Sequence, residues 1–298
     1  LSFNRIRKIS YLEDFLSFPN SLKYLILSNN NITGHFRQYK KFHFLDFSFN
    51  QLSSFYSWSI LNLYINNNYL TNISTNAINF NSNNNNLEEI CYENQKDSEF
   101  MNFNNNRIKL LKSNCNGVKT NKIYNLVKFY YLSNNQLNKI EKDYFAQLFN
   151  LIELDLSINN LSHIDSNVFN DLKSLTYLNL SFNRLEFIEK NLMRPLINLV
   201  KLDLSHNRIK HIDDESFLNL KYLLSLYVND NLFAKLNNRT FAGLDSIKDI
   251  FISKELFIKE DNVLSLRNTF KFKLSRQVLV YRFFESINIH HSDINLNF

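Results

Sequence analysis

Apolar and polar residues alternate along this chain in a spacing that fits neither one long helix nor one long strand. In residues 151–175, LIELDLSINNLSHIDSNVFNDLKSL, the apolar residues Leu154 and Leu156 lie two positions apart. Residues two apart point the same way from an extended backbone. Asn159 then occupies a place where the pattern calls for another buried side chain. The segment therefore predicts a short strand, followed by a turn that contains a buried amide.

The same arrangement returns every 24 residues through the second half of the chain. Further copies begin at Val127, Leu175, Leu199 and Leu223. A fixed period of 20–29 residues with the pattern LxxLxLxxNxL is the signature of a leucine-rich repeat, in which coils stack and contact only their neighbours. Although 298 residues could form two domains, the repeats predict a single elongated α/β solenoid with one strand per coil.

The recurring Asn has a physical reason. A turn that follows a strand buries peptide groups that no strand partner can satisfy, and an Asn side chain offers two donors and an acceptor oxygen. Because buried polar groups must be paired, one such Asn per coil is predicted to form a structural ladder rather than to bind a ligand. The predicted ladder consists of Asn30, Asn50, Asn68, Asn106, Asn135, Asn159, Asn183, Asn207 and Asn231.

A second apolar column supports the same class of fold. It consists of aromatic residues that are each followed by Leu three residues later: Phe145, Phe169, Phe217 and Phe241. Met193 fills the remaining slot. These side chains are expected to fill the wide side of each coil, away from the strands.

The repeats are less regular towards the N-terminus. We expect one solenoid over residues 1–257, irregular at 71–126 and regular at 127–257, followed by a degenerate terminal coil or cap at 258–298. The first residues, LSFNRI, already match the middle of a repeat, so the sequence is expected to be a segment of a longer protein.

Two registers compete within the irregular region. One places a strand around Met101 with Asn106 in the ladder. The other places a strand at residues 87–92 with Gln95 in the Asn position, and the two are too close for both to be full coils. The run of four Asn at 83–86 reads as an exposed loop.

The 24-residue copies, LxxLxLxxNxLxxI followed by FxxL, resemble the typical-subtype leucine-rich repeats of animal extracellular proteins, such as Toll-like receptor ectodomains and Slit-like proteins. The resemblance covers residues 127–257 well and 1–70 loosely. It implies a horseshoe with a parallel β-sheet on the concave face and a convex side that is mostly irregular or short 3-10 helix. It also implies a role in binding. Neither end carries the cysteine-rich caps common in extracellular members.

Motifs for catalysis or for cofactor binding are not evident. The three Gly are isolated, no HExxH or GxSxG occurs, and no His or Cys set suits zinc. Asp203, Ser205 and His206 are consecutive strand and turn positions of one repeat rather than a catalytic triad. We therefore expect no catalytic residue, no cofactor and no metal, and the lack of a run of 18 apolar residues predicts no membrane contact within this segment.

The chain is basic, with a net charge of +6 and an isoelectric point near 9.1. Its basic residues concentrate between Arg107 and Lys142. Such a stripe can attract nucleic acid or an anionic glycan, but a solvated face on a Lys-rich protein is the simpler interpretation.

The strand residues between the buried leucines should face outward in columns, because neighbouring parallel strands keep equivalent residues side by side. Large aromatic side chains dominate the energetics of protein interfaces, so these columns are predicted to bind a protein ligand. The predicted binding residues are Phe129, Tyr131, Glu153, Asp155, Tyr177, Asn179, Lys201, Asp203 and Tyr227.

Taken with the resemblance, the residues predict a non-enzymatic protein-binding module of an extracellular or cell-surface receptor. The alternatives are an intracellular repeat scaffold and a receptor for anionic polymers. In an oxidising compartment Cys91 and Cys115 could form a disulfide, or they could remain separate thiols. Sequons for glycosylation occur at Asn31, Asn72, Asn160, Asn179 and Asn238, about as many as the Asn-rich composition would produce by chance.

Overall fold

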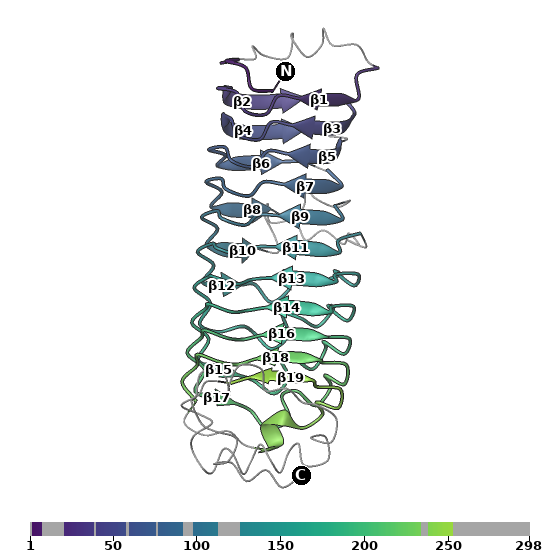
Figure 1. Cartoon of the computed structure of the whole chain (residues 1–298), viewed down its shortest axis with the longest axis vertical. Coiled ribbons are helices and arrows are strands. Elements are labelled where there is room, and N and C mark those ends of the chain that lie inside the picture. Colours follow the sequence, from purple (N-terminus) through teal and green to yellow (C-terminus); the bar gives the residue numbers. More distant parts are fainter. Residues whose placement is uncertain are drawn as a thin grey trace, which may run out of the picture.

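The chain winds into an elongated stack of coils (Figure 1). The computed structural model describes residues 2–7, 21–38, 40–57, 60–75, 77–91, 98–112, 126–233 and 238–252. Within them, each coil contributes one short strand to a parallel sheet of eleven strands, called here the long sheet. In spatial order its strands are β1 (Tyr24–Ile26), β3 (Phe42–Asp46), β5 (Ile60–Tyr64), β7 (Asn79–Asn81), β9 (Phe100–Asn102), β11 (Phe129–Tyr131), β13 (Glu153–Asp155), β14 (Tyr177–Asn179), β16 (Lys201–Asp203), β18 (Ser225–Tyr227) and β19 (Asp249–Phe251).

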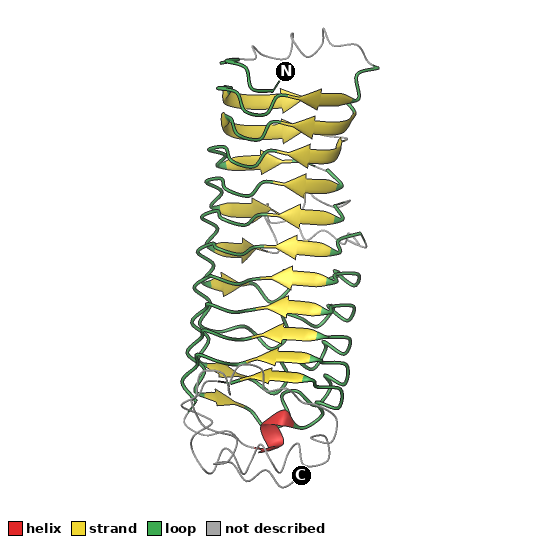
Figure 2. Ribbon diagram, viewed as in Figure 1, coloured by secondary structure: helices red, strands yellow, loops and turns green. Residues whose placement is uncertain are grey.

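A second row of strands runs beside the long sheet in Figure 2. It forms three small parallel sheets: β2 (Thr33–Gln38), β4 (Gln51–Ser57) and β6 (Asn72–Ser74); β8 (Glu89–Cys91), β10 (Leu110–Lys112) and β12 (Lys139–Ile140); and β15 (Phe187–Ile188) with β17 (His211–Ile212). The one described helix is the short 3-10 helix η2 (Asn238–Phe241). Outside the long sheet we expected mostly irregular chain or short 3-10 helix. The structure instead has this second row of strands there.

Strands of the long sheet pair residue for residue, so equivalent side chains of successive coils lie in line. Leu154 pairs with Leu178, Leu178 with Leu202, and Leu202 with Leu226. Each of these Leu side chains is fully buried, whereas the residues on either side of it are only partly buried. The alternation of a pleated strand thus sends one column into the core and two columns outward.

The predicted aromatic column lies in the core. Phe145, Phe169 and Phe217 are fully buried, and Met193 is fully buried in the slot between the last two. The rings of Phe145 and Phe169 stack with centroids 6.3 Å apart. Burying such a side chain stabilises a fold by about 1.5–3 kcal/mol, so the column contributes to every regular coil.

The N-terminal coils are shorter and close in another way. Asn50 and Asn68 are 18 residues apart, and Asn68 and Asn85 are 17 apart, which leaves no room for the Phe-containing turn of the 24-residue coils. Longer second-row strands β2 and β4 occupy this side instead. Phe36 packs against Phe47 and Phe55 with ring centroids 4.4 Å and 4.8 Å apart, which fills the coil that these strands enclose.

The structure decides between the two registers of the irregular region. Strand β9 carries Met101 into the long sheet and Asn106 into the ladder. The alternative register is wrong: residues 89–91 do form a strand, β8, but it lies beyond the turn of the preceding coil and pairs with β10 in the second row. That coil enters the long sheet through β7, and its ladder residue is Asn85. The exposed-loop prediction is therefore wrong for Asn85, whose side chain is buried.

Two other expectations concern residues outside this description. The proposed terminal coil or cap at 258–298 lies outside the described residues, as does Gln95. Among the described residues, no helix has the length and apolar character needed to cross a bilayer.

Candidate functional site: the outward face of the long sheet

The amides of the predicted ladder are fully used by the backbone. Asn159 donates from Nδ2 to the carbonyl oxygens of Leu156 and Ser157 in its own coil and of Leu132 in the preceding coil, at 3.0–3.1 Å. Its Oδ1 accepts the N–H of Leu137 at 2.9 Å. Asn30, Asn50, Asn68, Asn106, Asn135, Asn183, Asn207 and Asn231 lie in the equivalent place and bond in the same manner.

The outward columns of the long sheet carry aromatic and charged side chains in contact across strands. The hydroxyl of Tyr131 donates to Oε2 of Glu153 at 2.7 Å. Lys201 lies over two rings at once, with Nζ 5.0 Å from the centroid of Tyr177 and 5.2 Å from that of Tyr227. These contacts link β11 to β13, and β14 to β16 and β18, so this face is laterally connected.

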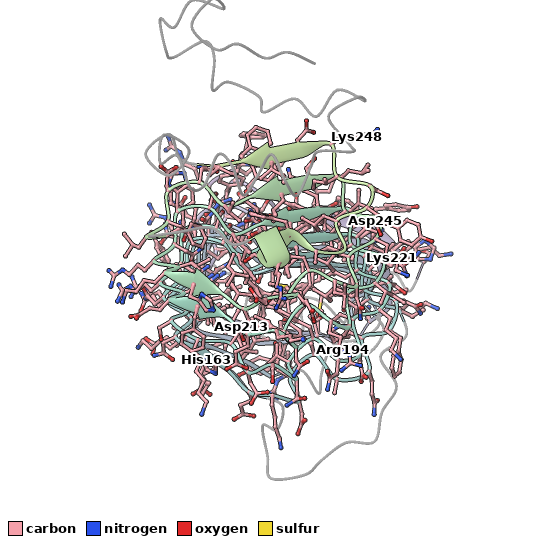
Figure 3. The ribbon with its side chains drawn as sticks, turned by 90° about the horizontal axis from the view of Figure 1, so that it is seen from below. His163, Arg194, Asp213, Lys221, Asp245 and Lys248 are labelled. Atoms are coloured by element: carbon pink, nitrogen blue, oxygen red, sulfur yellow. The ribbon has the colours of Figure 1, made fainter. Side chains whose placement is uncertain are left out.

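The outward face continues to the last described strand. The rings of Tyr227 and Phe251 are parallel, 2° apart in orientation, with centroids 4.2 Å apart. Figure 3 looks along the stack and places Lys248, which precedes β19, on the side of the long sheet, and Arg194 on the opposite side. The backbone N–H of Lys190 donates to Oδ2 of Asp213 at 3.1 Å, and Figure 3 places Asp213 away from the long sheet. Lys190 therefore serves as a reference point away from the long sheet.

One outward column also shapes the turn after several of the strands, where it holds Asp or Asn. Oδ1 of Asp203 accepts the N–H of Ser205 at 2.9 Å and its hydroxyl at 2.6 Å. Oδ1 of Asn179 accepts the same two groups of Ser181, at 3.1 Å and 2.8 Å. Since the neutral amide makes the same bonds as the carboxylate, the turn does not require a negative charge at this position.

Partial burial beside carboxylates shifts the titration of this face. Burial, with the charges of Asp155 and Asp203 next in size, raises the pKa of Tyr177 to about 12. Burial and the hydrogen bond to Glu153 raise the pKa of Tyr131, and burial with nearby carboxylates raises the pKa of Tyr227. The face is therefore partly desolvated and negative.

The carboxylate of Asp155 shows the same environment. Burial raises its pKa most, and the charge of Asp203 raises it further, while hydrogen bonds from Ser157 oppose the shift. A raised pKa means that the negative charge is held at a cost in the folded protein.

A feature that sequence inspection missed lies at the edge of this face. The residue before each ladder Asn has a left-handed backbone, and in most coils it is Asn, His or Asp. In three coils it is instead apolar and about half exposed: Phe49 (φ 56°), and, in two successive coils, Ile158 (φ 52°) and Phe182 (φ 53°). The ring of Phe182 stacks on that of His206 at 4.0 Å. We call Ile158, Phe182 and His206 the edge ridge.

The other candidate groups are dispersed. Ser205 donates its hydroxyl to Asp203, whereas His206 lies 3.3 Å from Oδ2 of Asp230, so these residues are not arranged as a Ser–His pair. Among the described residues, no three His, Cys, Asp or Glu side chains come together as metal ligands would.

The basic stretch between Arg107 and Lys142 is partly neutralised by ion pairs. Lys109 pairs with Glu88 at 3.2 Å and Lys128 with Glu99 at 2.6 Å. Its central residues, 113–125, lie outside the described residues.

The predicted modification sites differ in their surroundings. Asn31 and Asn72 are exposed, and Asn160 is partly buried. Asn179 is partly buried in the middle of the long sheet and bonds to Ser181, so a glycan there would cover the predicted binding face. The side chains of Asn238 and Cys91, and the whole of Cys115, lie outside the described residues.

Comparisons with known families identify the class of protein. Residues 130–185 and 197–257 match the family model described as "Leucine rich repeat", and residues 21–38 match a second model of the same name. The matched segments are leucine-rich repeats, and the fold is that of a protein-interaction module.

A solved structure of the Drosophila protein Toll has a similar fold. It is described as the Toll–Spatzle complex, "a molecular hub in Drosophila development and innate immunity", and it matches with a TM-score of 0.55 and 18% sequence identity. The match covers 78% of this chain but only 38% of the Toll chain. At this identity the likeness concerns the fold alone. No curated protein matches the sequence.

Proposed function

We propose that this chain is the ligand-binding part of an extracellular or cell-surface receptor, and that its protein ligand lies on the long sheet between β11 and β18. The observation that supports the proposal is the pair of outward columns, in which Tyr177, Lys201 and Tyr227 are held against one another on successive strands. Large aromatic side chains supply contact area at low entropic cost. The long sheet would then form the concave wall of a horseshoe.

The comparisons support a receptor role only by analogy. Toll is described in a complex with another protein, Spatzle, and leucine-rich repeats are extended scaffolds suited to binding. Glycosylation at Asn31, which is exposed, would place the natural protein in the secretory pathway, and mass analysis before and after glycan removal measures it.

The location of the ligand is tested by photo-crosslinking. A photoreactive residue replaces Tyr177 in one version of the full chain and Lys190 in another, and each is exposed to the medium and extract of the source cells. We expect a crosslinked protein from position 177 and none from position 190. The partner is then purified and its affinity is measured for Tyr177→Ala, Tyr227→Ala and Lys190→Ala.

Each tyrosine variant should weaken binding of that partner by roughly tenfold or more, as for interface residues that contribute over 1 kcal/mol. Lys190→Ala should bind as the unchanged chain does. If Lys190→Ala abolishes binding while both tyrosine variants are silent, the proposed binding face is wrong.

A further inference from the structure

The charged residues of the long sheet are unevenly distributed. On strands β11 to β19 the outward positions of the two columns hold four carboxylates and one ammonium: Glu153, Asp155, Asp203 and Asp249, with Lys201. On the equivalent positions of β1 to β9 the charged residue is Asp46. A chain with a net charge of +6 thus has a negative face on its C-terminal half.

The fold does not require these charges. The turn after β14 is closed by Asn179 with the same two hydrogen bonds that Asp203 makes after β16. Both bonds to Asp203 reach its Oδ1, so Oδ2 of Asp203 can accept a further donor. Asp155 likewise accepts the N–H of Ser157 at Oδ1. One strand, β14, lies between these residues, so they are two inter-strand spacings apart, about 10 Å.

The molecule itself shows how this face holds a cation. Lys201 places its ammonium over the rings of Tyr177 and Tyr227, and aromatic faces attract ammonium and guanidinium groups. Carboxylates lie beside the same tyrosines. Their partial burial costs free energy of desolvation, and the turns of the fold do not require their charge.

From this charge complementarity we propose that the face of β13 to β18 binds a basic segment of its protein partner, with an Arg or Lys side chain of that segment seated between Asp155 and Asp203. The proposal rests on the proposed function and adds the chemistry of the partner. Guanidinium groups fit it best, because they bond carboxylates in a planar fork and stack on aromatic rings.

A defined probe tests the inference without knowledge of the natural partner. The probe is a fluorescent Gly-rich peptide with three Arg residues placed three apart. Three residues span about 10 Å of extended chain, and the Gly residues between them let the backbone turn so that the Arg side chains can share one face. Its controls replace every Arg by Gln or by Glu. We expect the full chain to bind the Arg peptide, with weaker binding at high salt, and to bind neither control.

The decisive variant is Asp155→Asn combined with Asp203→Asn. It keeps the turn bonds that Asn179 already makes, so thermal unfolding should remain as in the unchanged chain. It should weaken binding of the Arg peptide by about tenfold or more. The matched control, Glu186→Gln with Glu215→Gln, removes two charges of the same sign that pair with Lys210 and Lys190 away from the long sheet, and it should have little effect.

Lys201→Gln provides a change of the opposite sign. It removes a competing cation from Tyr177 and Tyr227, so it should tighten binding of the Arg peptide several-fold. The inference is overturned if the unchanged chain does not bind the Arg peptide or if the double Asp variant binds it equally well. It is also overturned if the variant with Glu186→Gln and Glu215→Gln weakens binding as much as the double Asp variant does.

The two proposals fail in different ways. If a partner crosslinks at position 177 but binds the double Asp variant normally, the proposed function stands and the proposal of a basic segment is refuted. If the chain binds the Arg peptide but no protein is captured at position 177, the cation-binding face stands and the proposed protein ligand on this face is contradicted.

Discussion

The side-chain oxygen of Asn183 accepts the backbone N–H of Leu161, a residue of the preceding coil, at 3.0 Å. The nitrogen of the same amide donates to Leu156 of that coil and to two carbonyls of its own. A single polar side chain therefore ties two layers of the core together.

Replacing Asn183 by Ala should lower the free energy of unfolding by about 1–3 kcal/mol, because it leaves buried backbone groups unpaired. Chemical denaturation measures the change. The adjacent Arg184 is exposed, and Arg184→Ala should alter stability by less than about 0.5 kcal/mol. Equal effects of the two substitutions would contradict the structural role of the ladder.

The edge ridge makes a prediction of increased stability. Ile158 holds a left-handed backbone, a conformation that costs a residue with a branched side chain about 1–2 kcal/mol. Asn tolerates it and stands there one coil earlier, as Asn134. Ile158→Asn should therefore stabilise the chain by about 1 kcal/mol.

The reverse exchange, Asn134→Ile, should destabilise the chain by at least as much, since it also removes the 2.7 Å bond from Asn134 to Asn105. Unfolding midpoints of the two variants should move in opposite directions. A fall in stability for Ile158→Asn would mean that the half-exposed Ile side chain packs more favourably than its exposure indicates.

Two glycines with the same backbone angle separate steric collision from conformational strain. Gly243 (φ 86°) faces the backbone of Leu218, and an added Cβ would lie 2.3 Å from the Leu218 oxygen. Gly34 (φ 88°) has open space around it. Both Ala substitutions should destabilise the chain, but Gly243→Ala should cost at least about 1 kcal/mol more, as overpacking does. Thermal denaturation of the two variants side by side measures the difference.

The titration of Tyr177 should depend on the fold. Because burial raises its pKa to about 12, its phenol should ionise later in the folded chain than in the unfolded chain, whose tyrosines titrate near 10. The contribution to stability is complete below the unfolded pKa and is lost as pH rises through the folded pKa. Absorbance titration should therefore lose a late-ionising component in Tyr177→Phe, and an unchanged curve would refute the assignment.

The repeat pattern was sufficient to predict the stack and most of the ladder, because residues 24 apart must meet the same environment. It failed at Asn85. That coil has Ala77 and Ser82 at positions where other coils have large apolar side chains, and four consecutive Asn residues offered equivalent choices. Asn85 is identified as the ladder residue only by its place in the stack, between the amides of Asn68 and Asn106.

The outward face was predicted as columns but not as contacts. That Lys201 and Tyr177 are neighbours follows from the period. That one ammonium lies over two rings depends on side-chain rotamers, which the sequence does not specify. The edge ridge was missed because the left-handed backbone is easy to read where Asn occupies the position, and hard to read where Ile158 and Phe182 do.

The ladder also bears on how such a molecule can change in length. Asn207 offers Leu185 the same oxygen that Asn183 offers Leu161, so any two regular coils present matching surfaces to each other. Excision of one whole period would bring Asn207 against Leu161 with every bond remade, whereas excision of half a period would turn apolar residues outward. Duplication or loss of gene segments can therefore alter the reach of the binding face in whole-coil steps while the bonding within each layer stays constant.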